Sequence, residues 1–253
     1  MSDDPVLRSL ARRALRRLLW SRIDEPSTAE LARSAWVFAP HQDDEVLGCG
    51  GTILRKRAAG ARVRIAFLSD GSGSHKHLLP AGEIATLRRG EALRAARRLG
   101  VAESDVAFVG LEDGRLSAQC DAGAAAVESL LVQHPSDEVY LPHRDEPPPD
   151  HAACNRMVRS GMKAARLSAT AFEYPVWLWD AWPWTAASLR EPVTWRGEVS
   201  KILRTNARLL RDFRVGLRIA GELEQKRSAL FEHRSQTSRD DRGGSWPILQ
   251  DIA

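Results

Sequence analysis

The sequence lacks the features that mark several classes of protein. Its three cysteines are too few and too scattered for a disulfide framework, so a reducing, cytoplasmic location is the simplest expectation. No run approaches the ~18 apolar residues of a membrane span. The N-terminus lacks the apolar segment and the small-residue cleavage site of a secretory signal. No zinc finger, RNP-like strand or recognition-helix pattern is present, so no nucleic-acid partner is expected.

Arginine supplies nearly all of the excess behind the net charge of +4. This excess is typical of a GC-rich genome, which favours Arg and Ala, and the weaker alternative is an attraction to anionic substrates or surfaces. Residues 6–20 carry Leu and Ala at helical spacing with Arg between them, which predicts an amphipathic basic helix. Such a helix can dock on its own domain, or it can serve as an arm for a membrane surface or a partner. We expect residues 1–34 to form an N-terminal basic helical extension and residues 35–253 a single domain, and a homo-oligomer is left open.

Strand-like and helix-like segments alternate along most of the chain. The apolar runs predict four strands, at 35–40, 62–71, 105–114 and 137–143. Amphipathic or glycine-terminated segments predict helices between them, at 48–60, 83–101 and 122–135. This alternation predicts an α/β fold with a mostly parallel sheet and helices on both faces. Three successive prolines exclude regular structure from residues 143–151, and a further helix is expected after them.

The stretch "VFAPHQDDEVLGCGG", residues 37–51, places one histidine and three acids directly after the first predicted strand. Sites in parallel sheets form beyond the carboxyl ends of strands, and a divalent cation would offset the repulsion between the acids. His41 and Asp44 can offer a nitrogen and an oxygen to one ion. A third ligand is expected from the loop after the fourth strand, where His151 is a better candidate than His143. Asp43 would then lie beside the metal and could take a proton from water.

Two other interpretations of this stretch are open. The acids could cap a helix N-terminus and interact favourably with its dipole. "GCGG" could be a phosphate-binding loop, because it follows a strand and opens a helix. It does not match G-x-G-x-x-G, however, and the neighbouring acids would repel phosphates.

Residues on a predicted helix, at another strand end and in nearby loops are candidates for binding a substrate. Arg88 could contact hydroxyls or a phosphate, or it could form a surface pair with Glu91 one turn along the same helix. Asp113 could bind sugar hydroxyls or cap a turn. Tryptophans could stack on a sugar or pack in the core. The tryptophans in question are Trp177, Trp179, Trp182 and Trp184. The remaining candidates are Ser72 and His75, which lie in a polar loop.

Several motifs together resemble the LmbE-like, or PIG-L (N-acetylglucosaminyl-phosphatidylinositol de-N-acetylase), family. They are "APHQDDEVLGCGG" (39–51), "SDGSGSH" (69–75), "LRRGEALRAARRLGV" (87–101), "VGLEDGRL" (109–116), "PPDHAACN" (148–155) and "KRSALFEHRSQ" (226–236). The resemblance implies a Rossmann-like fold and a zinc-dependent hydrolase. Its expected reaction removes an N-acetyl group from an amino sugar, such as N-acetylglucosamine, or from a glycoconjugate.

By position, the resemblance implies that His41, Asp44 and His151 hold one Zn²⁺ and that Asp43 is the general base. Such a ligand set also accepts Fe²⁺ or Co²⁺. Glu45 is expected to hold the turn through backbone hydrogen bonds.

The chain departs from the family pattern at two positions. Gln42 replaces the usual proline, and Pro148 replaces a histidine that often stabilises the oxyanion or protonates the departing amine. His143 or His233 could supply that proton. If neither does, the chain is a catalytically weakened metal-site binding protein of the same fold. A third possibility is an accessory subunit that docks through its basic N-terminal helix.

Overall fold

The computed structural model describes residues 13–14, 17–74, 79–177, 207–208 and 210–237. The chain divides into two compact units. One comprises residues 28–176 and 219–253 and holds the sheet, and the other comprises residues 1–27 and 177–218. The expected domain boundary at residue 34 stays a prediction.

The larger unit is built on a five-stranded, fully parallel sheet with the order β3-β2-β1-β4-β5. Its strands are β1 (Ala35–Ala39), β2 (Val63–Ser69), β3 (Val106–Leu111), β4 (Glu138–Pro142) and β5 (Thr170–Tyr174). The strand order reverses at β1, which lies between β2 and β4. In such sheets a ligand crevice opens beyond the carboxyl ends of the strands at the point of reversal.

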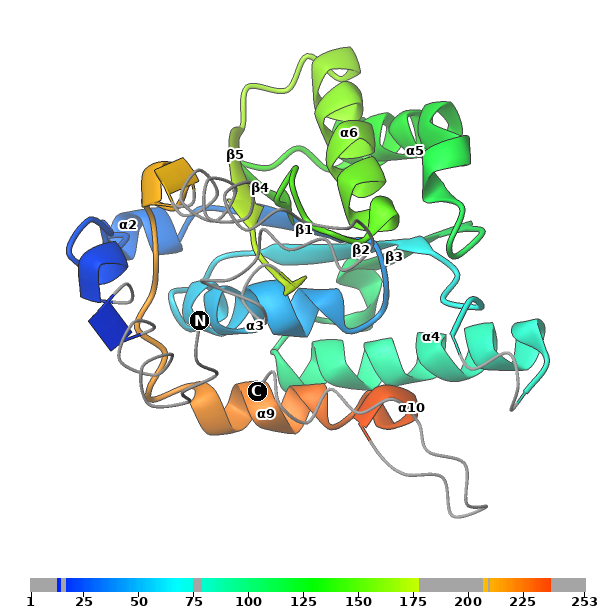
Figure 1. Cartoon of the computed structure of the whole chain (residues 1–253), viewed down its shortest axis with the longest axis horizontal. Helices are drawn as coiled ribbons and strands as arrows, with labels where there is room; N and C mark the ends of the chain where they lie inside the picture. The colour runs from blue at the N-terminus through cyan, green and yellow to red at the C-terminus, as the bar shows by residue number, and fades with distance from the viewer. Residues whose placement is uncertain (1–12, 15–16, 75–78, 178–206, 209, 238–253) are drawn as a thin grey trace, which may run out of the picture. The chain divides into compact units, whose positions relative to one another are not determined.

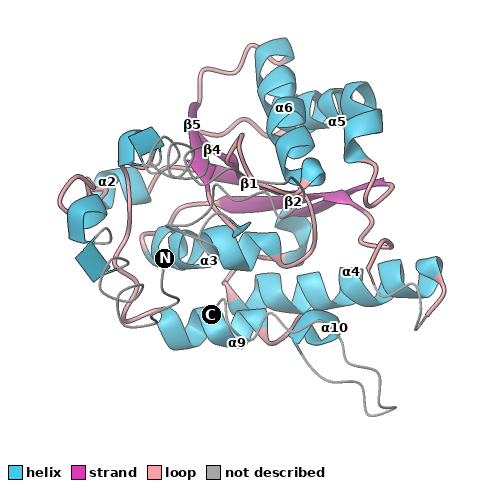
Figure 2. Ribbon diagram, in the orientation of Figure 1, coloured by secondary structure: helices cyan, strands magenta, loops and turns pink. Residues whose placement is uncertain are grey.

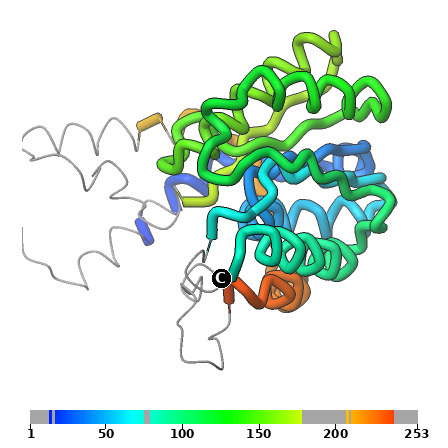
Figure 3. The backbone as a smooth tube through the Cα atoms, turned by 90° about the vertical axis from the view of Figure 1, so that its right-hand side faces the viewer, coloured from blue at the N-terminus to red at the C-terminus, as the bar shows by residue number. Residues whose placement is uncertain are grey.

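Helices cover both faces of this sheet, as Figures 1 and 2 show. The described helices of this unit are α2 (Thr28–Leu31), α3 (Asp44–Ala58), α4 (Ala81–Arg98), α5 (Cys120–Gln133), α6 (Pro149–Ala164), α9 (Leu223–Leu230) and α10 (Arg234–Thr237), with short 3₁₀ turns at Glu103–Asp105 and Leu116–Gln119. Helices α5 and α6 lie on one face, and α3, α4 and α9 lie on the other, which is also clear in the rotated view of Figure 3. The predicted α/β fold is confirmed.

The central strand β1 contributes to both layers of the core because successive side chains of a strand point to opposite faces. Val37 and Ala39 pack with side chains of α3, α4 and α9. Trp36 and Phe38 pack with side chains of α5 and α6. All five residues of the strand are buried. A strand buried on both sides leaves only its carboxyl end able to present polar groups to a ligand.

The described strands match the predicted ones closely, but three sequence-based expectations were incomplete. Helix α3 begins at Asp44 and not at residue 48, so the acids occupy its first turn. Helix α6 begins at Pro149, so the expectation that residues 143–151 hold no regular structure was wrong for residues 149–151. A proline at the first helical position costs little because its missing N–H would have no partner there. The last of the three prolines therefore starts the helix. Strand β5 was not predicted, because Thr170–Tyr174 has neither a continuous apolar run nor a regular alternation of polar and apolar residues.

The smaller unit is described in part. Residues 13–14 and 17–20 are helical, and the rest of the predicted basic helix over 6–20 lies outside the described residues. Asp24 and Val215 form a parallel bridge, and the Arg218 guanidinium lies 5.0 Å from the centre of the Trp20 ring. None of the helices in the described ranges is long and apolar enough to cross a membrane.

Candidate active site

The turn between β1 and α3 has an unusual backbone conformation. Asp43 adopts φ 140° and ψ −29°, a region that residues with a side chain rarely occupy. Its N–H donates to Glu45 Oε2 over 2.9 Å, which holds the turn. The expectation that Glu45 stabilises this turn is thus confirmed. Asp43 makes no side-chain capping hydrogen bond to the helix, so its carboxylate is not used as a simple cap.

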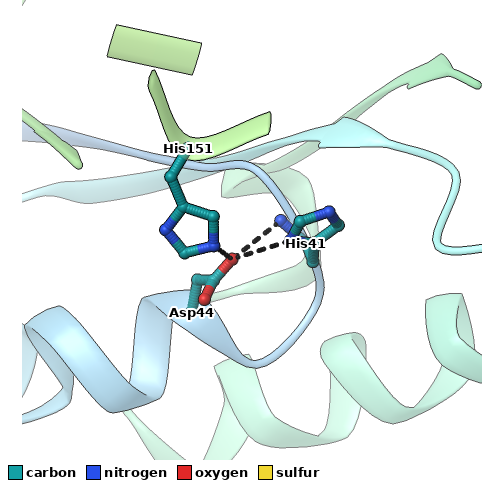
Figure 4. A group of neighbouring side chains, drawn as sticks. All are labelled: His41, Asp44 and His151. Carbon is teal, nitrogen blue, oxygen red and sulfur yellow. Dashed lines mark hydrogen bonds and ion pairs between the residues drawn. The ribbon is translucent and has the colours of Figure 1, made fainter. Parts of the chain in front are cut away.

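Three side chains from two strand ends converge beside this turn, as drawn in Figure 4. Asp44 Oδ2 lies 3.2 Å from His41 Nδ1 and 3.3 Å from His151 Nε2, and it also accepts the His41 backbone N–H over 3.1 Å. His41 and Asp44 follow β1, whereas His151 lies in the first turn of α6, after β4. The three predicted metal ligands therefore meet at the point where the strand order reverses.

The donor atoms of this group suit a small divalent cation. One atom from each of His41, Asp44 and His151 can be chosen so that all three lie within 4.8 Å of one another. Zinc bonds of about 2.0–2.2 Å in a tetrahedron separate neighbouring ligand atoms by roughly 3.3–3.6 Å. The separations from Asp44 Oδ2 to the two imidazoles, 3.2 and 3.3 Å, are of that size. The residues present thus fit the cation that the family pattern implies.

The outer nitrogen of His41 faces two further carboxylates. Its Nε2 lies 3.1 Å from Asp113 Oδ1 and 3.5 Å from Asp150 Oδ2. Burial lowers the pKa of His41, but Asp113, Asp150 and Asp44 outweigh this effect and raise the pKa well above 6.5. Burial likewise opposes ionisation of Asp113, yet its bonds from His41 and Gly73 and the charge of Arg88 lower its pKa to about 2. The cluster is strongly negative and attracts positive charge.

Asp43 lies at the edge of this cluster and faces Arg88. Its Oδ2 is 3.6 Å from Arg88 Nη2. Burial raises the pKa of Asp43 to about 6, although the charge of Arg88 opposes the shift. Burial raises the pKa of Asp44 as well, but His151 and His41 outweigh this and lower it. Two adjacent carboxyls thus have pKa values displaced in opposite directions.

Arg88 is buried and is not part of a surface pair. It is 3% exposed, and its Nη2 donates to the backbone oxygen of Gln42 over 2.6 Å. Glu91, its suggested partner, instead accepts both the N–H and the hydroxyl of Ser235. The surface-pair interpretation was therefore wrong. Arg88 fixes the loop before Asp43 and lies 4.0 Å from Asp113 Oδ2.

The structure places the two candidate proton donors in different surroundings. His233 Nε2 lies 2.9 Å from Glu45 Oε1, and both side chains are fully buried. His143 Nδ1 accepts the N–H of Asp145 over 3.2 Å, and its Nε2 lies 3.5 Å from Glu173 Oε2. These contacts link His233 to the turn that carries Asp43, and His143 to strand β5.

The other predicted substrate residues are only partly described. Ser72 is buried, and its N–H donates to Asp70 Oδ1 over 2.9 Å. Trp177 is 37% exposed and belongs to the smaller unit. His75 and the three remaining tryptophans of the aromatic stretch lie outside the described residues.

Two buried acids near the triad were given no role by the sequence. Asp150 accepts the N–H groups of Gly114 and Leu116 at 2.8 and 3.2 Å, and so joins the start of α6 to the loop after β3. Glu146 Oε2 lies 3.5 Å from His151 Nδ1. The crowding of acids around the prolines was the available signal, but the pattern did not say which of them face inward.

The glycines of "GCGG" lie inside α3 and not in a loop before it. A Cβ atom on Gly48 would meet the Tyr174 ring at 2.2 Å, and one on Gly51 would meet Ile219 at 2.6 Å. The absent side chains therefore make room for neighbouring elements. This explains the glycines without a phosphate-binding loop.

The comparison with known proteins agrees with the geometry of the site. A family model described as PIG-L: GlcNAc-PI de-N-acetylase matches residues 36–162, half of the chain. This segment contains the three residues of the triad and Asp43. A comparison with curated proteins gives no match.

Solved structures share the fold. The conserved protein TT1542 from Thermus thermophilus is 24% identical, with a TM-score of 0.57 over 81% of this chain and 80% of its own. The N,N'-diacetylchitobiose deacetylase of Pyrococcus horikoshii is 19% identical, with a TM-score of 0.52 over 92% and 79%. GalB, the 4-carboxy-2-hydroxymuconate hydratase of Pseudomonas putida, is 16% identical, with a TM-score of 0.50 over 74% and 92%. One fold thus serves different reactions, and a function has to be argued from the site.

Proposed function

Since this chain belongs to the PIG-L family of GlcNAc-PI de-N-acetylases, we propose that it is a metal-dependent hydrolase that removes an N-acetyl group from an amino sugar or an amino-sugar conjugate. The observation that carries the proposal is the convergence of His41, Asp44 and His151 at one sheet edge, with Asp43 on the adjoining turn.

In this proposal His41, Asp44 and His151 hold one divalent cation, with zinc as the first candidate. Zinc would supply a Lewis acid that polarises an amide carbonyl and makes water more acidic near neutral pH. The negative cluster around His41 favours a cation for the same reason that it raises the pKa of that histidine. Fe²⁺ and Co²⁺ suit the same donors.

Asp43 is proposed as the general base. Its carboxylate projects from a turn that Glu45 and Arg88 hold on either side, through the Asp43 N–H and the Gln42 carbonyl respectively. A positioned carboxylate accepts a proton from water as the water attacks the acetyl carbon. Because the neighbouring Asp44 binds the cation, the two adjacent acids have separate roles.

The departing amine needs a proton, and the family position for a histidine donor is occupied by Pro148. Pro148 precedes the first turn of α6 and has no group to donate. We propose His143, with His233 second, as the donor. Arg88, Asp113 and Ser72 are proposed to meet the sugar, whereas His75, outside the described residues, and Trp177, in the smaller unit, stay sequence-based predictions.

The proposal is tested by measuring acetate and free amine from a panel of N-acetyl amino sugars with zinc-loaded protein. His151→Ala should abolish release and zinc binding, whereas the exposed His134 provides a matched control in His134→Ala. Wild-type protein that binds zinc but releases no acetate from any member of the panel would favour the weakened binding protein, which Pro148 supports.

A further inference from the structure

We propose that Glu146 is a positioning residue that orients the imidazole of His151, so that its Nε2 is presented to the bound cation. The inference rests on the proposed metal site. Glu146 belongs neither to the triad of His41, Asp44 and His151 nor to the turn between β1 and α3 that carries Asp43. It also lies outside the sequence motifs that resemble the family.

The first observation is the pairing of two buried groups. His151 Nδ1 and Glu146 Oε2 are 3.5 Å apart, and their side chains are 1% and 0% exposed. His151 Nδ1 is one of the few buried side-chain nitrogen and oxygen atoms among the described residues that make no hydrogen bond. A shift of about 0.5 Å would bring the pair to ordinary N–H···O distance. Glu146 is thus the carboxylate that this nitrogen faces.

The second observation is that Glu146 is itself held in place. Its Oε1 accepts the N–H of Val176 over 2.7 Å, just beyond the end of β5. Its own N–H donates to the carbonyl of His143 over 3.1 Å, and the N–H of His143 donates to the Tyr174 carbonyl over 2.8 Å. The loop after β4 is therefore joined to β5 at several points, and the Glu146 carboxylate has a fixed direction.

The prolines between Glu146 and His151 contribute to this arrangement. Each proline ring holds φ near −65°, so residues 147–149 lose few conformations on folding. The N–H of His151 donates to the carbonyl of Pro148 over 3.1 Å, which begins the helix. The loop thus carries the acid and the histidine on one stiff segment.

The third observation is that the other histidine of the triad has the same kind of partner. His41 turns Nδ1 toward Asp44 and presents Nε2 to Asp113 at 3.1 Å. A carboxylate on the outer nitrogen fixes the tautomer of a metal-bound imidazole and raises its basicity. Glu146 is the corresponding carboxylate for His151, because it faces the outer nitrogen, Nδ1.

The substitution Glu146→Gln separates orientation from packing because it keeps the size of the side chain. A glutamine can accept the Val176 N–H with its oxygen only by turning its amide NH₂ toward His151 Nδ1. The metal-binding tautomer carries a proton on that nitrogen, so two donors would oppose each other. The reverse orientation sets the NH₂ group against the Val176 N–H. Either arrangement disfavours the cation-binding form of His151.

The test is zinc affinity, measured by competition with a chelating dye, in wild-type protein, Glu146→Gln and Asp145→Asn. Asp145→Asn is the matched control, since it removes a carboxylate from the same loop at a side chain that is 40% exposed. We expect Glu146→Gln to weaken zinc binding by about 10–100-fold, with the control near wild type. The melting temperature of metal-free Glu146→Gln should stay near that of the control.

Unchanged zinc affinity in Glu146→Gln would overturn this inference alone and leave the proposed function standing. A weaker affinity accompanied by a melting temperature well below the control would also overturn it, because Glu146 would then be merely structural. Wild-type protein that binds no zinc would overturn both. As a measurement that needs no variant, the ¹⁵N spectrum of zinc-loaded wild-type protein should show a slowly exchanging proton on His151 Nδ1.

Discussion

His233 Nε2 lies 2.9 Å from Glu45 Oε1, although 188 residues separate the two along the chain. The other oxygen of Glu45 accepts the N–H of Asp43. The late "EHRSQ" segment is thus connected through one carboxylate to the turn that carries the proposed base. A buried acid with both oxygens engaged restrains that turn from two directions.

This pair should make stability depend on pH. Burial lowers the pKa of His233, but the Glu45 carboxylate outweighs it and raises the pKa above 6.5. A raised folded-state pKa means that the stabilisation is fully present below pH 6.5 and is lost as the pH rises through the raised value. Glu45→Gln should lower the unfolding free energy of metal-free protein by about 1–3 kcal/mol below pH 6.5, and by less at alkaline pH. Urea unfolding across this range measures the difference.

The matched control for that experiment is Glu112→Gln, because the Glu112 side chain is 55% exposed and pairs with Arg115 at the surface. Its effect should be small at every pH. A difference between wild type and Glu45→Gln that does not shrink as the pH rises would contradict the assigned charge pair.

Asp43→Asn should separate catalysis from metal binding. If Asp43 is the general base, the variant keeps zinc stoichiometry and loses about 10²–10⁴ in hydrolysis rate. Asp44→Asn, one residue along, should instead lose the cation. Zinc analysis after gel filtration and acetate release at saturating substrate provide the two measurements. Loss of zinc from Asp43→Asn would make that residue a ligand.

Replacement of His143 and His233 tests which of them protonates the departing amine, since Pro148 cannot. The alkaline limb of a pH–rate profile reports an essential acid, so His143→Ala or His233→Ala should remove it and lower the rate. Zinc content is measured in parallel to exclude an indirect effect. If both variants keep the wild-type limb and rate, neither histidine is the donor.

Two helix glycines should respond to alanine in opposite directions. Gly48→Ala would place a Cβ 2.2 Å from the Tyr174 ring, whose hydroxyl donates to the Phe38 carbonyl, so we expect a loss of about 1–3 kcal/mol. Gly90→Ala, in α4, meets nothing closer than 3.5 Å and should gain about 0.5–1 kcal/mol. Urea unfolding of both variants checks the pair. Equal effects would mean that Tyr174 moves aside at little cost.

The fold and the convergence of His41, Asp44 and His151 could be predicted from the sequence because both depend on local patterns. Apolar runs marked four of the five strands, and polar clusters after two of them marked the sheet edge where His41, Asp44 and His151 meet. Strand β5 was not predicted because it is an edge strand whose side chains are mostly only partly buried. Its sequence, Thr170–Tyr174, therefore mixes polar and aromatic residues and lacks the apolar pattern of the other strands.

Contacts that depend on side-chain direction could not be predicted. Nothing in the spacing indicated that Glu146 faces His151, or that Glu45 would meet His233 from the far end of the chain. The one-turn spacing of Arg88 and Glu91 allowed either a surface pair or a substrate contact, whereas the Arg88 guanidinium is buried against the Gln42 carbonyl. Burial of this kind is decided by how the layers pack.

The positive φ of Asp43 sets the proposed catalytic role of this residue against the stability of the turn that carries it. Such a conformation costs on the order of 1–3 kcal/mol for a residue with a side chain, and essentially nothing for glycine. A glycine would therefore relax the turn, but it would also remove the carboxylate that faces Arg88. Selection for a robust fold and selection for turnover would pull this position in opposite directions. A variant library screened only for thermal tolerance should therefore accumulate inactive proteins changed at residue 43.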